Sequence, residues 1–153
     1  MARIEALPDY EREFLLAMEM PSFETRPWVT GPPLKERRLA LVTTAGLHRR
    51  DDRPFSVGVP EYRLIPGDVE ADELVMSHIS VNFDRSGYQR DLNIAFPIDR
   101  MRELEADGEI GSLATYHYSF MGAAAPEAIE PNARRLAGIL KGDGVDSVLL
   151  TGV

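Results

Sequence analysis

Two nearly unbroken runs of apolar residues, residues 39–46 and 145–151, constrain the fold of this chain most. The first run closes with Gly46, and the second is interrupted only by Asp146 and Ser147. A strand with one face in water alternates polar and apolar residues, whereas a strand of a helix-covered parallel sheet is apolar throughout. The chain is therefore expected to be an α/β protein with an open, mostly parallel sheet and flanking helices.

The remaining segments fit this architecture. Helices are predicted at residues 8–20, from Arg100 to about Asp107 with Asp99 as the N-cap, and from Pro126 or Pro131 to Lys141. Further strands are predicted at residues 62–65, 74–81 and 113–120, the last with Tyr116, Tyr118 and Phe120 on one face and His117 and Ser119 on the other. The proline-rich stretch 21–33 predicts an arm. Residues 1–37 are thus expected to form an N-terminal helix and arm, and residues 38–153 one domain.

Composition excludes several classes of function. The 153 residues include 17 Lys and Arg against 25 Asp and Glu, a net charge of −8 that argues against nucleic acid or an anionic membrane as a partner. No apolar run reaches the roughly 18 residues of a transmembrane helix, and residues 1–10 do not resemble a secretory signal, so a cytoplasmic protein is expected. The absence of cysteine excludes disulfides, thiolate metal sites and thiol nucleophiles from these 153 residues.

The last predicted strand runs directly into Gly152 and Val153. Open parallel sheets bind ligands at the carboxyl ends of their strands, where a loop or helix normally follows. We therefore expect the domain to be truncated at the C-terminal end of a central strand.

Short motifs in a fixed order carry a family resemblance. They are residues 38–48 (RLALVTTAGLH), 62–66 (YRLIP), Ser77-His78, 91–93 with 96–100 (FPIDR), 108–111 (GEIG), 117–122 (HYSFMG), 143–146 (DGVD) and 149–151 (LLT). Together they resemble the selenoprotein B subunits of glycine, sarcosine and betaine reductase and the related D-proline reductase subunit. The resemblance covers most of residues 38–153.

This resemblance implies reductive cleavage of a C–N or other carbon–heteroatom bond. It places a selenocysteine or cysteine, the nucleophile, just after Val153, so these 153 residues alone are expected to be inactive. A selenolate is ionised at neutral pH without the environmental help that a thiol needs. The implied partners are a small-molecule substrate and a thiol reductant or partner reductase subunit, and no cofactor is expected in this chain.

Three histidines, His48, His78 and His117, lie at or just beyond predicted carboxyl ends of strands. If the strands are parallel, the imidazoles converge on the ligand edge and are candidate catalytic residues, able to protonate a leaving amine or hold a carboxylate. The alternative for each is a structural hydrogen-bonding role.

Candidate substrate-binding residues follow the same strands and the polar loop between them. They are Thr43, Thr44, Gly46, Asp84, Asp91, Asn93 and Ser119. For the threonines and aspartates, the alternative is simple turn or capping chemistry.

A second class of function also fits the sequence: a non-catalytic subunit, or an α/β protein that binds a small anion or a metal. A metal is not expected, because no pair of histidines has the i, i+4 spacing of a helical metal motif. No dinucleotide or phosphate-binding loop occurs either. The unfinished strand edge and the arm suggest a homo-oligomer.

Overall fold

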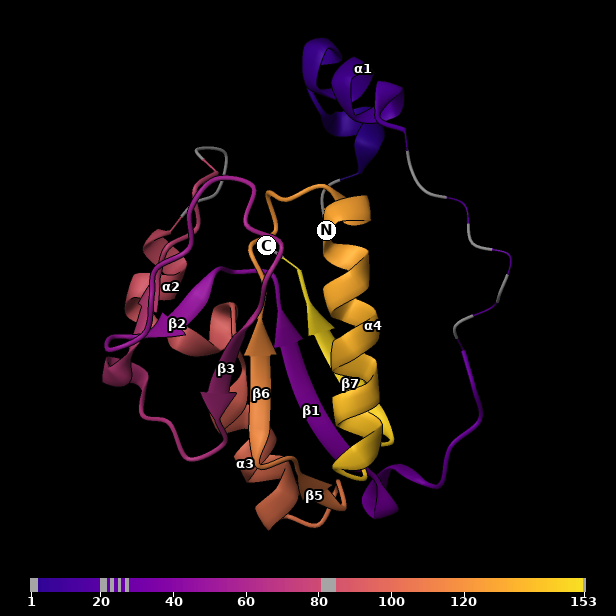
Figure 1. Cartoon of the computed structure of the whole chain (residues 1–153), viewed down its shortest axis with the longest axis vertical. Coiled ribbons are helices and arrows are strands. Elements are labelled where there is room, and N and C mark those ends of the chain that lie inside the picture. Colours follow the sequence, from indigo (N-terminus) through magenta and orange to yellow (C-terminus); the bar gives the residue numbers. More distant parts are fainter. Residues whose placement is uncertain are drawn as a thin grey trace.

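The computed structural model describes residues 3–19, 22, 24, 26, 28–80 and 85–152. Within them, the main sheet has five strands: β3 (Arg63–Pro66), β6 (Tyr116–Ser119), β1 (Arg38–Thr43), β5 (Ser112–Leu113) and β7 (Ser147–Thr151). β1 pairs in parallel with β5, β6 and β7, whereas β3 is antiparallel to β6. The carboxyl ends of β6, β1 and β7 therefore meet at one edge (Figure 1). The expected mostly parallel α/β sheet is confirmed.

Helices cover both faces of β1, which explains its unbroken apolar sequence. α4 (Pro126–Gly142) lies in front of β1 and β7 in Figure 1, and its buried Leu136 and Leu140 belong to a cluster that includes Ala40 of β1. α3 (Ile98–Ala106) and the short helix η4 (Leu92–Ile94) cover the other face. There, Leu39 and Leu41 of β1 lie in the second cluster. Alternate residues of β1 thus enter two separate cores.

A two-stranded sheet follows the carboxyl end of β1. β2 (Leu47–Arg49) pairs antiparallel with β4 (Leu74–Met76), so the strand predicted at 74–81 ends five residues early. The chain turns from β1 into β2 at Gly46, whose φ of 65° favours glycine. A Cβ at this position would also lie 3.1 Å from the backbone nitrogen of His78. The turn therefore brings residues 46 and 78 close together.

Two shorter helical segments, η3 (Ala71–Glu73) and α2 (Ser86–Arg90), complete this half of the domain. The N-terminal region contains η1 (Ile4–Ala6), α1 (Asp9–Ala17) and η2 (Leu34–Glu36). None of the residues of α1 is buried, and its Phe14 and Leu16 are both 68% exposed. No helix in the described part of the chain has the length and apolarity needed to cross a membrane.

Three sequence predictions differ from the structure. β7 is not a central strand: among the described strands it pairs with β1 alone, and its Leu150 is 73% exposed. The strand predicted at 113–120 breaks between β5 and β6, although its alternation of faces is confirmed. Asp99 is not the N-cap of α3, because the helix begins at Ile98 and Pro97 takes that position.

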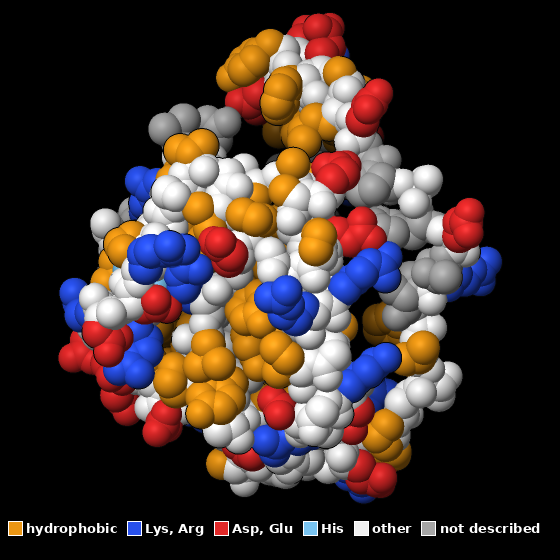
Figure 2. All heavy atoms as spheres, in the orientation of Figure 1, with side chains coloured by type: hydrophobic (Ala, Val, Ile, Leu, Met, Phe, Trp, Pro, Cys, Tyr) orange, Lys and Arg blue, Asp and Glu red, His pale blue; other side chains and the backbone are white. Residues whose placement is uncertain are grey.

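The face of the sheet that carries α4 is only partly covered. Figure 2 shows hydrophobic side chains gathered beside α4 on this face. Leu64 of β3 and Tyr116 of β6 are 43% and 41% exposed, respectively. α4 thus covers the part of this face that includes Ala40 of β1 and Tyr118 of β6, whereas Leu150 of β7 is 73% exposed.

Candidate functional site

A row of polar residues crosses the sheet at the edge where the parallel strands end. In register, Arg63 of β3 lies beside Ser119 of β6, Ser119 beside Thr43 of β1, and Thr43 beside Thr151 of β7. Paired residues of neighbouring strands project from the same face of a sheet. We call these four residues the edge row.

The three hydroxyl groups of the edge row hold the surrounding backbone. Thr43 and Thr151 both donate to the carbonyl oxygen of Ala95, each at 3.0 Å. Thr43 Oγ1 also accepts the N–H of Ala45 at 3.2 Å. The Oγ of Ser119 accepts the N–H of Leu47 at 2.7 Å. Thr43 and Ser119 are fully buried, so these contacts fix the path of the chain beyond β1.

Beyond this edge, Ser77 and His48 form a hydrogen-bonded pair. His48 is 3% exposed, and its Nδ1 lies 2.7 Å from the carbonyl oxygen of Arg49. Because a carbonyl only accepts, Nδ1 carries a proton, and in the neutral imidazole Nε2 accepts the hydroxyl of Ser77 at 2.6 Å. The backbone N–H of Ser77 donates to the oxygen of Gly46 at 2.9 Å, which holds the pair directly after β1.

This arrangement has the form of a hydroxyl group activated by a base that is itself oriented by a third group. The base is the imidazole, and the third group is a backbone carbonyl. Sequence reasoning found His48 but missed Ser77, which stood in a segment predicted to be a strand. The dipeptide Ser77-His78, at the end of an apolar stretch, was the available signal.

His78 lies next to this pair. Its side chain is buried, and its Nδ1 accepts the N–H of Ser80 at 3.2 Å, while Arg85 donates to its carbonyl oxygen. Burial, and then the charge of Arg85, lower the pKa of His78 below its ordinary value. A neutral imidazole at this position can bind a ligand by hydrogen bonding without adding charge.

His117 is not at the edge, contrary to the expectation that the three imidazoles converge there. It is the second residue of β6, because this strand begins only at Tyr116, and it is fully buried. Its Nδ1 accepts the N–H of Leu41 at 3.0 Å, and its Nε2 has no hydrogen-bond partner among the described residues. Burial, followed by the charge of Arg102, lowers the pKa of His117 to about 4.

The remaining residues predicted to bind substrate do not lie together in the structure. Thr44 lines an apolar cavity of about 370 Å³ together with Gly122 and the first turns of α4. Asp91 accepts the N–H of Asn93 at 2.9 Å, and Asn93 in turn accepts the N–H of Asp99 at 3.0 Å. Hydrogen bonds from Asn93 lower the pKa of Asp91. Asp84 lies outside the described residues.

Arg63, the fourth member of the edge row, was missed as a site residue. Its guanidinium is nearly buried, with Nε donating to the oxygen of Arg53 at 2.9 Å and Nη1 to that of Tyr62 at 3.2 Å. The Phe55 ring lies 4.5 Å from the guanidinium carbon. The sequence signal was a lone cation inside the otherwise apolar stretch 62–65.

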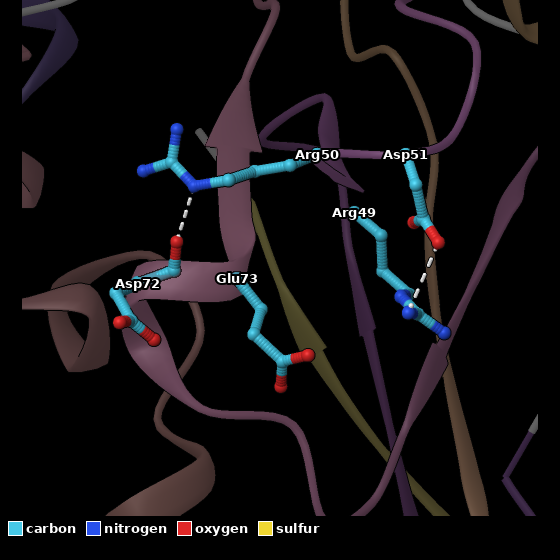
Figure 3. A pocket seen from close by; sticks show the side chains of 5 residues that line it. All are labelled: Arg49, Arg50, Asp51, Asp72 and Glu73. Atoms are coloured by element: carbon cyan, nitrogen blue, oxygen red, sulfur yellow. Dashed lines mark hydrogen bonds and ion pairs between the residues drawn. The ribbon is translucent and has the colours of Figure 1, made fainter.

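A charged pocket of about 360 Å³ lies near β2, lined by Arg49, Arg50, Asp51, Asp72 and Glu73 (Figure 3). Arg49 pairs with Asp51 at 3.1 Å, and Arg50 donates to the carbonyl oxygen of Asp72. Arg49 is thus paired with a carboxylate, whereas Arg50 donates to a neutral carbonyl. In the part of the chain that the structure describes, no three His, Cys, Asp or Glu residues gather as metal ligands.

Comparison with known proteins places this chain in a family. The model of the glycine/sarcosine/betaine reductase selenoprotein B family matches residues 9–153. The chain is 37% identical to the D-proline reductase subunit gamma of Acetoanaerobium sticklandii over 134 residues, 80% of this chain and 54% of that protein. It is 30% identical to the glycine reductase complex component B subunit gamma of Carboxydothermus hydrogenoformans over 148 residues, 90% of this chain and 33% of that protein.

The betaine reductase complex component B subunit beta of Peptoclostridium acidaminophilum is 31% identical over 123 residues, 77% of this chain and 28% of that protein. The chain thus spans about half the length of the proline reductase subunit and about a third of the other two. No solved structure matches it significantly. The family match extends over nearly the whole sequence, so the chain belongs to the glycine/sarcosine/betaine reductase selenoprotein B family.

Proposed function

We propose that the chain is a component of a reductase complex that cleaves a carbon–nitrogen bond in a small amino acid or N-methylated amino acid. The names of its relatives support this substrate class, since they are reductase components for D-proline, glycine and betaine. All of these compounds contain a carboxylate close to the nitrogen. A thiol reductant or a partner reductase subunit would supply the two electrons of the reaction.

The nucleophile is proposed to be a selenocysteine or cysteine directly after Val153, as the family resemblance implies. Such a residue would follow shortly after the end of β7, whose last residue, Thr151, lies beside Thr43. In the substitution, a bond forms from selenium or sulfur to carbon, while the carbon–nitrogen bond breaks and its electron pair leaves with nitrogen. An uncharged amine nitrogen must be protonated to leave as an amine, whereas the quaternary nitrogen of betaine leaves without a proton.

We propose that His48 supplies this proton through Ser77. When the imidazole is protonated, Nε2 donates to the Ser77 oxygen at the observed 2.6 Å contact, and the hydroxyl hydrogen can then turn toward the leaving nitrogen. The neutral His78 beside it is proposed to bind substrate. For Thr43 and Ser119 we propose a supporting role, because their hydroxyls are already engaged within the fold. Thr44, Gly46, Asp91 and Asn93 remain predicted substrate contacts.

The observation that carries this proposal is the Ser77–His48 hydrogen bond directly beyond the central parallel strand of a reductase-family chain. The test is the dithiol-dependent consumption of D-proline, glycine, sarcosine and betaine by the complex purified with and without this protein. Loss of one of these activities, restored by adding the protein back, is expected. If every activity persists without it, the chain is a non-catalytic or binding subunit instead.

Relatives that are subunits of complexes also support a protein partner. The exposed apolar side chains of β7, Val148, Leu149 and Leu150, mark the strand where we expect a partner subunit or a second copy to pair. Size-exclusion chromatography with light scattering checks this expectation. A strictly monomeric protein, both alone and with the other components, would contradict it.

A further inference from the structure

Arg63 brings a positive charge into the interior beside the candidate site. Its side chain is 8% exposed, and a buried charge is costly unless an anion compensates it. The carboxylate of Asp52 lies 3.9 Å from Nε, beyond hydrogen-bonding distance, and is itself 40% exposed. Among the residues that the structure describes, the groups within hydrogen-bonding distance of the guanidinium are the neutral carbonyls of Arg53 and Tyr62. The charge is therefore incompletely compensated by the fold.

The guanidinium also retains hydrogen-bonding capacity. It has five N–H groups in a planar fork, and Nε and Nη1 are the atoms that donate to other described residues. Nη2 is buried and has no hydrogen-bond partner among the residues described. A carboxylate fits such a fork with two parallel hydrogen bonds, and its charge compensates that of the arginine.

We infer that Arg63 binds the carboxylate of the substrate, a step that rests on the proposed function. Its place in the edge row supports this role, because it lies in register with Ser119 of β6, and Ser119 lies beside Thr43 at the end of β1. Phe55 links it to the proton-transfer pair: the ring lies 4.5 Å from the guanidinium carbon, and its centre lies 6.4 Å from that of the His48 ring. The anion site and the proton donor are thus neighbours.

The segment between β2 and β3 covers Arg63. Its Phe55 is 6% exposed, whereas Val57 is 82% exposed. The segment is also tied down by the bond from Arg63 to Arg53 and by one from Asn132 to Pro60 at 3.2 Å. Withdrawal of the Phe55 ring uncovers the guanidinium, and an incoming carboxylate replaces the Arg53 carbonyl.

Calorimetric titration of the chain with D-proline and with D-prolinamide tests the inference. The amide has the same ring but no charged carboxylate, so wild-type protein is expected to bind it about 10- to 100-fold more weakly than the acid. Arg63→Gln is expected to weaken binding of the acid by a similar factor and to leave amide binding unchanged. Arg63→Lys keeps the charge but lacks the fork, so its affinity for the acid is expected to lie between those of the wild type and Arg63→Gln. Arg134→Gln, an equal change of charge at a side chain 76% exposed, should have no effect.

Equal binding of acid and amide by the wild type would overturn the inference, as would unchanged acid binding by a folded Arg63→Gln variant. If the Arg63→Gln variant does not fold, the inference is tested by the binding of acid and amide to the wild type and by the affinity of Arg63→Lys for the acid. Activity of the complex separates the two proposals. If the complex has full reductase activity and the Arg63 variants bind the acid as tightly as the wild type, this inference alone is refuted. If the protein neither binds substrate nor supports activity, the proposed function is refuted as well.

Discussion

The imidazole of His117 completes the backbone hydrogen bonding of β1: its Nδ1 accepts the N–H of Leu41 at 3.0 Å. β5 pairs with the start of β1 and β6 with its end, and the break between them lies opposite Leu41. A buried N–H without an acceptor costs about 1–3 kcal/mol. His117 therefore acts as a structural part of the sheet.

Replacing His117 should test this role. His117→Ala removes the acceptor and leaves a cavity, so we expect a loss of about 2–4 kcal/mol in the free energy of unfolding. His117→Asn keeps an acceptor near the position of Nδ1 and should lose less. Urea unfolding gives the energies, and hydrogen exchange at the Leu41 amide isolates the bond. Equal protection of this amide in both variants would contradict the assignment.

The stability of the folded chain should depend on pH through the same residue. Burial lowers the pKa of His117 to about 4 from 6.5, so the unfolded state binds more protons than the folded state between these values. The contribution is fully present above pH 6.5 and is lost as the pH falls toward 4. It amounts to about 3 kcal/mol, since each pKa unit corresponds to about 1.4 kcal/mol. Urea unfolding at pH 7.5 and 4.5 measures it, and His117→Asn should flatten this part of the profile.

Thr43 and Thr151 offer a matched pair of substitutions, because both donate to the Ala95 oxygen. Thr43→Val also removes the acceptor for the Ala45 N–H and should cost about 1–3 kcal/mol. Thr151→Val removes a single bond at a partly exposed site and should cost about 1 kcal/mol or less. Thermal unfolding compares the two variants. A larger loss for Thr151→Val would show that the Ala45 contact contributes little.

The Ser77–His48 pair should matter for catalysis more than for folding. In the reductase complex, His48→Gln is expected to lower kcat about 100-fold or more, the usual contribution of general acid–base catalysis. Ser77→Ala should lower kcat as well, with little change in KM, because it interrupts proton transfer rather than binding. Ser112→Ala, at the opposite end of β1, is the control. If Ser77→Ala has wild-type kcat, the serine takes no part in proton transfer.

Local patterns predicted the parts of the fold that depend on alternation of side chains. The apolar run 39–46 correctly indicated a strand buried on both faces, and the alternation of His117 and Tyr118 correctly assigned the two faces of β6. The position of a strand within the sheet is different, because it depends on which neighbours it finds. The apolar sequence of β7 therefore predicted a central strand, although β7 pairs with β1 alone among the described strands.

The candidate site could be predicted only in part for a related reason. His48 follows the apolar run 39–46, so its place beyond β1 could be anticipated, whereas His78 lay inside the strand predicted at 74–81, which ends at Met76. The break between β5 and β6, which carries His117 into the interior, has no strong sequence signal. The role inferred for Arg63 depends on its contacts with Arg53 and Phe55 in the preceding loop, and such loop contacts are visible only in three dimensions.

Peptide-mapping mass spectrometry of the protein from its own organism tests the proposed chemistry most directly. We expect a peptide that contains residues 145–153 and continues immediately with selenocysteine or cysteine, identified by its isotope pattern or by alkylation. A natural protein of 17.1 kDa whose last residue is Val153, with neither selenium nor a thiol, would contradict the account.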